Sequence, residues 1–242
     1  MKRAVIFGAT GGIGKEIALD LAKAGWSLYL HFDKSKQKAL VLQKQLIKLY
    51  PQQEFFLLHL SFLDQDEKLL NLSKTLFPIN ALIFAQGITD YDFLGNQSLK
   101  TIDNILKVNL ITPIKLTRLL EPLLLKHEHS RIIYLGSVYG QQGSPLESVY
   151  SASKGGITRF AQAYAREVAA SKLTVNVLAP GAVNTPMNEI FSTEILNQVR
   201  DEIPANRLAN PKDISFWVKN LLAPQSDYLT GQTIYIDGGW LV

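Results

Sequence analysis

The chain has 242 residues, of which 47 % are hydrophobic, and this is enough to bury the core of one α/β domain. Its 25 basic and 21 acidic residues leave a net charge of +4, spread along the chain, so we expect no nucleic-acid partner. With no cysteine and only four histidines, disulfides, thiolate ligands and cysteine nucleophiles are excluded, and we expect no metal site.

The chain begins with Met1-Lys2-Arg3, and only four apolar residues follow before Gly8, which is too few for the core of a signal peptide. No apolar run reaches the ~18 residues of a membrane span. We therefore expect a cytoplasmic protein that does not contact a membrane.

Short apolar runs alternate with longer stretches of helical periodicity, which is the pattern of repeated β-α units. The expected strands are Ala4–Phe7, Leu28–Phe32, Glu54–Leu60, Ala81–Ala85, Arg131–Leu135, Thr174–Leu178 and Thr233–Ile236. The expected helices are Ile13–Ala24, Lys36–Leu49, Asp64–Leu76, Leu99–Leu125, Val149–Ala170 and Pro211–Leu222. Several strands are apolar throughout, as in parallel sheets that helices cover on both faces. The sequence therefore predicts one domain over residues 1–242, a doubly wound parallel sheet of seven strands in a three-layer α/β/α sandwich.

One long interruption, residues 181–208, separates the sixth expected strand from the last expected helix. Met187, Ile190, Phe191 and Ile195 recur within it at helical spacing. Loops of this length are seldom structureless and are often functional. We expect a small helical lid over the substrate, with Met187 and Phe191 as substrate contacts. A helix that only packs on the core is the alternative.

A glycine-rich turn, Gly8-Ala9-Thr10-Gly11-Gly12-Ile13-Gly14, joins the first expected strand to the first expected helix. Its glycines let the backbone approach a pyrophosphate, whose charge the helix N-terminus then stabilises. A tight connection without a ligand is the alternative, but the position between strand and helix favours dinucleotide binding. The expected cofactor contacts here are Gly8, Thr10, Gly11, Gly12, Ile13 and Gly14.

The second expected strand ends in Phe32-Asp33-Lys34-Ser35, where dinucleotide-binding folds meet the adenosine ribose. An acidic residue at the strand tip would bind both ribose hydroxyls and repel a 2′-phosphate, but the tip residue here is Phe32. Lys34 and Ser35 are able to pair with a 2′-phosphate. Asp33 argues for NADH, and Lys34 could also be solvated surface. We expect NADPH rather than NADH, with Phe32, Lys34 and Ser35 as cofactor contacts.

Tyr150 and Lys154 are four residues apart in an expected helix, so their side chains share one face. A phenol has a pKa of about 10, and a nearby ammonium group should lower this pKa towards the range of acid–base catalysis. Ser137 follows the fifth expected strand at a carboxyl end of the sheet, where its hydroxyl could donate to a substrate carbonyl oxygen. A surface pair on an amphipathic helix is the alternative for Tyr150 and Lys154. The serine and the glycine-rich turn argue against it.

Asn109 is a candidate because Pro113 lies four residues later in a helical stretch. Proline has no N–H, so the Asn109 carbonyl loses its donor within the helix, and the helix should bend there. The freed carbonyl could hold a water molecule at the site. A simple proline kink is the alternative.

These motifs, with the C-terminal Thr230-Gly231-Gln232 and Asp237-Gly238-Gly239-Trp240, resemble the short-chain dehydrogenase/reductase family over the whole chain. The resemblance implies a Rossmann fold and a catalytic tetrad of Asn109, Ser137, Tyr150 and Lys154. It implies that Tyr150 donates the proton in reduction and that Ser137 orients the carbonyl. It further implies that Lys154 binds the nicotinamide ribose and lowers the tyrosine pKa, and that the Asn109 carbonyl holds a relay water.

The resemblance also implies contacts for which this chain departs from the family. The family's Asn-Asn-Ala-Gly after the fourth strand is here Phe84-Ala85-Gln86-Gly87, which puts the local stability of the sheet in doubt but not the chemistry. Phe7 replaces a threonine, and Ser61 an acid. The implied cofactor contacts are Ser61, Phe62, Ala85, Gln86, Gly87, Tyr150, Lys154, Pro180, Gly181, Val183 and Thr185. The implied substrate contacts are Ser137, Tyr139, Gln142 and Tyr150, together with the lid residues Met187 and Phe191.

Within the family, the chain resembles bacterial 3-oxoacyl-(acyl-carrier-protein) reductases of fatty acid biosynthesis. The segments Leu28-Tyr29-Leu30-His31, Val138-Tyr139-Gly140-Gln141 and Glu202-Ile203-Pro204 also resemble a branch that reduces a 5-aminopentanone group on elongation factor P. The implied activity is NADPH-dependent reduction of a ketone to a secondary alcohol. The ketone would be carried on acyl carrier protein or, alternatively, on elongation factor P. A non-catalytic dinucleotide-sensing binding protein is an alternative of another class, but such proteins usually lose the tyrosine or the lysine.

The two longest expected helices, Leu99–Leu125 and Val149–Ala170, carry more apolar residues than one sheet face can cover. Leu116, Leu119, Leu120, Leu123 and Leu124 therefore suggest a self-association surface. The family resemblance implies a homotetramer or a homodimer. The alternative is that all of these leucines belong to the core of one chain.

Overall fold

One parallel sheet of seven strands runs through the centre of the computed structural model, which describes residues 1–186 and 191–240. The strands are β1 (Arg3–Phe7), β2 (Ser27–Phe32), β3 (Phe55–His59), β4 (Ala81–Phe84), β5 (Ser130–Leu135), β6 (Leu173–Pro180) and β7 (Thr233–Ile236). Their order is β3-β2-β1-β4-β5-β6-β7, and every neighbouring pair is parallel. The strand order reverses between β1 and β4, which is the doubly wound Rossmann arrangement.

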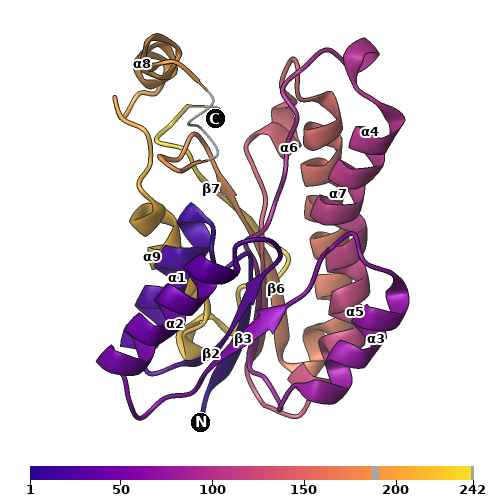
Figure 1. The fold of residues 1–242 in the computed structure, drawn as a ribbon, viewed down its shortest axis with the longest axis vertical. Coiled ribbons are helices and arrows are strands. Elements are labelled where there is room, and N and C mark those ends of the chain that lie inside the picture. Colours follow the sequence, from indigo (N-terminus) through magenta and orange to yellow (C-terminus); the bar gives the residue numbers. More distant parts are fainter. Residues whose placement is uncertain (187–190, 241–242) are drawn as a thin grey trace.

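Helices cover both faces of the sheet (Figure 1). One layer consists of α1 (Gly12–Lys23), α2 (Lys36–Leu49) and α9 (Pro211–Leu221). The other consists of α3 (Asp66–Thr75), α4 (Leu99–Leu106), α5 (Thr112–Leu124) and α7 (Ser148–Val168). Further helices are η1 (Leu94–Asn96), α6 (Tyr139–Gln142), η3 (Ala169–Ser171), α8 (Thr193–Glu202) and η5 (Pro224–Ser226). The three-layer sandwich predicted from the sequence is confirmed.

Each face of the sheet has its own apolar core, because successive residues of a strand point to opposite faces. In β1, Val5 and Phe7 join the cluster that also contains residues of α3, α5 and α7. Ala4 and Ile6 join the cluster with residues of α1, α2 and α9. All four side chains are fully buried. Burial on both sides is why this strand reads as one continuous apolar run.

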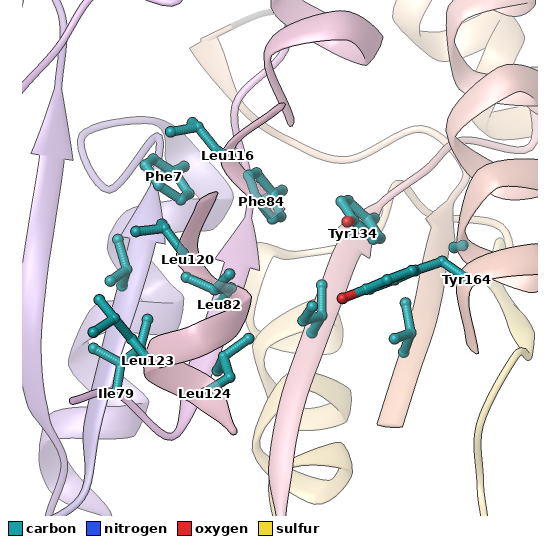
Figure 2. Close-up of a cluster of buried hydrophobic side chains, with 14 of the residues drawn as sticks. Phe7, Ile79, Leu82, Phe84, Leu116, Leu120, Leu123, Leu124, Tyr134 and Tyr164 are labelled. Atoms are coloured by element: carbon teal, nitrogen blue, oxygen red, sulfur yellow. The ribbon is translucent and has the colours of Figure 1, made fainter. Parts of the chain in front are cut away.

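An aromatic ladder crosses the centre of the sheet on the side of α5 (Figure 2). Phe7 of β1, Phe84 of β4 and Tyr134 of β5 are neighbours in register. Their rings stack, with 4.9 Å between centroids in each of the two pairs. The buried Tyr134 hydroxyl pairs with the Thr117 hydroxyl at 2.5 Å. The stacked rings thus connect the three strands near the place where the missing asparagines had put the stability of the sheet in doubt.

The leucines of α5 belong to this same core, which contradicts the prediction that they form a self-association surface. Leu116, Leu120 and Leu124 are fully buried, and Leu123 is 9 % exposed (Figure 2). Leu119 packs against the cluster from its edge. They share one face because residues three and four apart align along a helix. The homotetramer or homodimer stays a prediction, and these leucines do not support it.

Pro113 alters the helix before it, as the sequence predicts, but through a π-helical turn. The expected helix Leu99–Leu125 consists of α4, the π-helical segment η2 (Lys107–Ile111) and α5, which follow one another directly. The Thr112 N–H donates to the Lys107 carbonyl five residues earlier. Because Pro113 offers no N–H to Asn109, the backbone widens here instead of keeping the four-residue pattern.

Candidate active site

A pocket of about 250 Å³ opens at the carboxyl ends of the central strands. The segments after β4, β5 and β6 contribute Gly87, Ser137 and Gly181, and α7 contributes Tyr150 and Lys154. This is where open parallel sheets place their ligands, outside the point at which the strand order reverses. The predicted site residues that line the pocket are Ile13, Ala85, Gln86, Gly87, Ser137, Tyr139, Tyr150, Lys154, Pro180, Gly181, Val183, Thr185 and Phe191.

Ser137 lies in a backbone segment that stays tied to β6 beyond the end of β5. The Gly136 N–H donates to the Leu178 carbonyl at 2.7 Å, and the Val138 N–H donates to the Pro180 carbonyl at 3.1 Å. The Ser137 side chain is 9 % exposed and forms a hydrogen bond with the Tyr150 phenol. The structure thus brings the predicted serine and tyrosine together on a rigid support.

Tyr150 and Lys154 lie one turn apart on α7, with the lysine almost fully buried. The Lys154 Nζ lies 5.6 Å from the centre of the Tyr150 ring and donates to the Leu135 carbonyl at 2.8 Å. Burial lowers the pKa of Lys154 to about 8, because desolvation disfavours the ammonium form. Of the two side chains, Lys154 therefore titrates closer to neutral pH than Tyr150 does.

The expectation that Lys154 lowers the pKa of Tyr150 is wrong for this structure. Burial raises the pKa of Tyr150 to about 12, and the Ser137 hydrogen bond lowers it by less. The physical reason is that the phenol lies deep in the pocket, where desolvation of the phenolate is the largest effect. Tyr150 therefore keeps its proton at neutral pH, and only a more basic oxygen, such as a developing alkoxide, could take it.

The Asn109 side chain connects the loop after β4 to α7. Its Oδ1 accepts from the Ile88 N–H at 2.9 Å, and its Nδ2 donates to the Ile88 carbonyl at 2.8 Å. The same Nδ2 donates to the Ser153 Oγ at 3.1 Å, and that hydroxyl donates to the Tyr150 carbonyl at 2.7 Å. The sequence pointed only to the Asn109 backbone carbonyl. The structure shows that the amide positions the helix that carries Tyr150.

Close backbone approaches explain three glycines of the glycine-rich turn. Gly8 has a φ of +79°, and a Cβ there would lie 2.7 Å from the Gln86 backbone N. A Cβ at Gly14 would lie 2.1 Å from the Gly8 carbonyl oxygen, and one at Gly12 would lie 2.8 Å from the Thr185 Cγ2. Only glycine fits at these contacts. The turn is therefore packed between the loop after β4 and the segment after β6, and α1 begins within it.

His31 of β2 supports this turn, and the sequence reasoning missed it. Its Nδ1 accepts from the Gly8 N–H at 3.0 Å, and its Nε2 lies 2.9 Å from the Leu60 carbonyl. These two partners require a neutral ring with its proton on Nε2. Burial lowers the pKa of His31 to about 4, so the ring stays neutral at neutral pH. A single histidine in an apolar strand has no spacing pattern that would have revealed this role.

Two of the expected adenosine contacts have buried rings, and their contact with a cofactor stays a prediction. The Phe32 ring is 5 % exposed and stacks on His59, and the Phe62 ring is 4 % exposed within the core. Phe32 ends the fully buried strand β2, and Phe62 packs in the core beyond the end of β3. Ser61 donates its hydroxyl to the Asp33 carboxylate at 3.4 Å. Lys34 is exposed, and Ser35 is the residue before α2. Their contacts with the cofactor stay predictions.

The expected lid contains α8, Thr193–Glu202, and Ile195 lies within it. Phe191 lines the pocket, and its ring meets the Tyr91 ring edge-on at 5.2 Å. Met187 lies outside the described residues. Gln142 ends α6, is exposed and is not among the residues that line the pocket. In the glycine-rich turn, Thr10 is half-buried and Gly11 is exposed.

Several residues that line the pocket were missed by the sequence reasoning, because they come from segments far apart in the chain. Among them are Thr89, Tyr91, Ser144, Glu147, Leu196, Val199 and Trp240. The Thr89 hydroxyl donates to the Glu147 Oε1 at 2.7 Å, and the Trp240 ring meets the Tyr139 ring at 5.9 Å. Only Glu147 had a usable signal, since it lies one helical turn before Tyr150.

The chain is similar to known proteins over its whole length. A profile of the short chain dehydrogenase family matches residues 2–195. The uncharacterized oxidoreductase YmfI of Bacillus subtilis is 33 % identical over 240 residues, which cover 99 % of this chain and 98 % of the relative. The 3-oxoacyl-[acyl-carrier-protein] reductase FabG of Staphylococcus aureus is 31 % identical over 241 residues, which cover 98 % and 97 %. A crystal structure of a dehydrogenase/reductase from Sinorhizobium meliloti has a TM-score of 0.91 at 26 % identity, covering 100 % of this chain and 95 % of that one.

Among the described residues, no helix combines the length and the apolar character needed to cross a membrane. The fold, the glycine-rich turn and the pocket with Ser137, Tyr150 and Lys154 agree with the profile match and the relatives. The chain belongs to the short chain dehydrogenase family of oxidoreductases, whose members use nicotinamide dinucleotide cofactors.

Proposed function

We propose that the chain uses NADPH to reduce a ketone to a secondary alcohol. The observation that carries the proposal is that Ser137, Tyr150 and Lys154 line the same pocket as Ile13 at the start of α1. A ketone held there would meet a serine hydroxyl and a protonated phenol at its oxygen. The similarity to 3-oxoacyl-[acyl-carrier-protein] reductases supports reduction as the direction of the reaction.

The residues around the glycine-rich turn fit a dinucleotide. Gly8, Gly12 and Gly14 leave no room for side chains, so the turn offers bare backbone at the N-terminus of α1, where a pyrophosphate is stabilised. The segments Ala85–Gly87 and Pro180–Thr185 would hold the nicotinamide end beside the pocket. When bound, the reduced nicotinamide supplies the hydride that the carbonyl carbon receives.

Tyr150 supplies the proton that completes the reduction. Its raised pKa keeps the phenol protonated until negative charge develops on the substrate oxygen, which then takes the proton. Ser137 donates a hydrogen bond to the same oxygen and stabilises that charge. Lys154, one turn further along α7, would bind the nicotinamide ribose beside the phenol. The substrate gains a hydride at carbon and a proton at oxygen, which gives the alcohol.

The variant Tyr150→Phe tests the proposal. It should lower kcat by about two to four orders of magnitude, since the proton donor is lost, and leave the Kd for NADPH nearly unchanged. Tyr228→Phe is the matched control, because Tyr228 is fully exposed and away from the pocket. Full activity in Tyr150→Phe would reject the assigned role of the phenol.

The preference for NADPH over NADH rests on Lys34 and Ser35 at the start of α2, with no acidic residue at position 32. Asp33 is the opposing feature. Isothermal titration should give tighter binding of NADPH than of NADH, and Lys34→Ala should reduce that difference. Lys48→Ala is the control, since Lys48 is exposed at the other end of α2. An unchanged preference in Lys34→Ala would exclude this lysine as its cause.

Two carriers of the ketone follow from the resemblances: acyl carrier protein and elongation factor P. NADPH oxidation by the purified enzyme with an acetoacetyl thioester, compared with an aminopentanone-modified factor, separates them. Faster oxidation with the thioester supports the first carrier, and faster oxidation with the modified factor supports the second. Oxidation with neither would count against both.

A further inference from the structure

Tyr91, in the loop between β4 and α4, lines the catalytic pocket although it is 48 % exposed. Its ring meets the Phe191 ring edge-on, with 5.2 Å between the ring centroids, which is a favourable arrangement for two aromatic side chains. Phe191 comes from the segment before α8 and lines the same pocket. Two rings in contact leave no space for a ligand between them, so this pair bounds the pocket on one side.

Hydrogen bonds to the turn before α7 hold the loop on both sides of Tyr91. Two residues earlier, the Thr89 hydroxyl donates to the Glu147 Oε1 at 2.7 Å. One residue later, the Asp92 N–H donates to the Leu146 carbonyl at 3.0 Å. The backbone that carries the Tyr91 ring is therefore fixed relative to α7, the helix of the proposed proton donor.

The turn before α7 has an unfavourable conformation of its own. Leu146 has a φ of +64°, in the left-handed region that residues with a Cβ rarely adopt. Such strain persists only where the surrounding structure holds it, and it is concentrated at functional sites. The hydrogen bond from Asp92 is one of the contacts that hold it here. The strained residue is thus the one that anchors the loop next to Tyr91.

Tyr91 is also close to the groups that would bind the ketone oxygen, through Tyr139. The Tyr139 N–H donates to the Ser137 Oγ at 3.2 Å. Burial raises the pKa of the Tyr139 phenol, and the nearby Tyr91 phenol adds to this effect. The pocket measures only about 250 Å³, so a large substituent on a ketone bound at Ser137 reaches the side that Tyr91 bounds.

We propose that Tyr91 is a specificity-determining residue, whose contact with Phe191 limits the size of the ketone. The inference rests on the proposed ketone reduction at Tyr150. A substituent that is too large for the pocket has to separate the two rings, and this disfavours the larger substrate alone. Thr89 and Glu147 are positioning residues, because their hydrogen bond holds the loop that carries Tyr91.

Two ketones test the inference: butan-2-one and 4-phenylbutan-2-one, which differ by one phenyl ring. The measured quantity is the kcat/KM of the larger ketone with NADPH, divided by the kcat/KM of the smaller one. Tyr91→Ala should raise this ratio about ten times over that of wild type, because it opens the pocket to the phenyl ring. Tyr91→Phe keeps the aromatic ring and should keep the wild-type ratio.

The positioning role is tested with the same ratio. Thr89→Val keeps the shape of the side chain but removes the hydroxyl, so it should raise the ratio by about two to ten times. Thr89→Ser keeps the donor, and Glu147→Gln keeps an acceptor oxygen, so both should keep the wild-type ratio. A raised ratio in these two conservative variants, or an unchanged ratio in Thr89→Val, would remove the hydrogen bond from the inference.

Phe93→Ala is the matched control, because Phe93 is an exposed ring in the same loop and does not line the pocket. It should leave the ratio unchanged. A ratio that stays the same or falls in Tyr91→Ala would overturn the inference and leave the proposed reduction in place, and a fall would show that the ring binds the larger substituent. Reduction of neither ketone by wild-type enzyme that binds NADPH would overturn the proposed function, and the inference with it.

Discussion

The neutral ring of His31 should make the stability of the protein depend on pH in mildly acidic solution. The ring accepts from the Gly8 N–H and lies against the Leu60 carbonyl, so a protonated ring would lose the first bond. Burial holds the pKa at about 4 in the folded protein, against 6.5 for an ordinary histidine. Above pH 6.5 the ring is neutral in both states. As the pH falls towards 4 the unfolded chain binds a proton that the folded chain does not, so stability is lost over this window.

The magnitude follows from the two pKa values. The full difference between 6.5 and about 4 corresponds to about 3 kcal/mol, which is lost once the pH is below the folded-state pKa. At about pH 5 the linkage relation places the loss at roughly 2 kcal/mol. Urea denaturation at about pH 8 and about pH 5 measures this directly as a change in the free energy of unfolding.

The variant His31→Gln removes the titrating group, so wild type should lose roughly 2 kcal/mol more than the variant between these two pH values. His59→Gln is the control, because His59 is an exposed histidine on the neighbouring strand, and it should lose as much as wild type. Equal losses in wild type and His31→Gln would refute the reasoning, since they would show that the buried ring does not govern this part of the pH dependence.

Three further predictions concern catalysis, the core and the glycine-rich turn. In a pH profile, kcat/KM should fall as the pH rises through about 8, where Lys154 loses its charge, and Lys154→Arg should abolish that fall; a fall that persists in the variant would assign it to another group. In urea denaturation, Phe84→Ala should lower the free energy of unfolding by about 3–5 kcal/mol, and Phe93→Ala, at an exposed residue, by much less. An equally small decrease in both variants would contradict the importance of the aromatic ladder. Gly14→Ala should lower the free energy of unfolding by about 1–3 kcal/mol, measured by thermal unfolding, and should weaken NADPH binding. Gly95 has open space around it, so Gly95→Ala should change neither stability nor NADPH binding.

Most of the fold could be predicted because its signals are local. β1 reads as an apolar run between a charged start and a glycine turn. Helix α2 was predicted with the residues that the structure shows, Lys36–Leu49. The expected strand Thr174–Leu178 was shorter than β6, in which Leu173, Ala179 and Pro180 also pair with neighbouring strands. Pro180 pairs although a proline usually ends a strand.

The predictions that failed concern how a residue is used in three dimensions. The leucine stripe of α5 looks the same whether it meets a sheet or a second molecule, so only the position of β1, β4 and β5 decides. The predicted direction of the pKa shift of Tyr150 was wrong, because the burial of the phenol cannot be judged from the i, i+4 spacing to Lys154.

The candidate site also contains residues that the sequence could predict and residues that it could not. The glycine-rich turn, Ser137, Tyr150 and Lys154 have fixed spacings, and the structure brings them to one place. Trp240 and Thr89 come to the pocket from distant parts of the chain, and no spacing connects them. The family of oxidoreductases could therefore be predicted from the sequence, whereas the pocket residues that no spacing connects could be found only from the fold.

The π-helical turn at Lys107–Ile111 has a consequence for how this enzyme can vary. A turn of this kind holds about one residue more than an ordinary turn, which rotates the later helix by about 100° about the common axis. Both α4 and α5 can therefore bury their apolar sides, while Asn109 between them points towards Ile88 and Ser153. If a single residue were deleted from this segment, the sequence would still favour a helix. The protein would then lose either the contacts of the Asn109 side chain or the packing of α4 or α5 against the core.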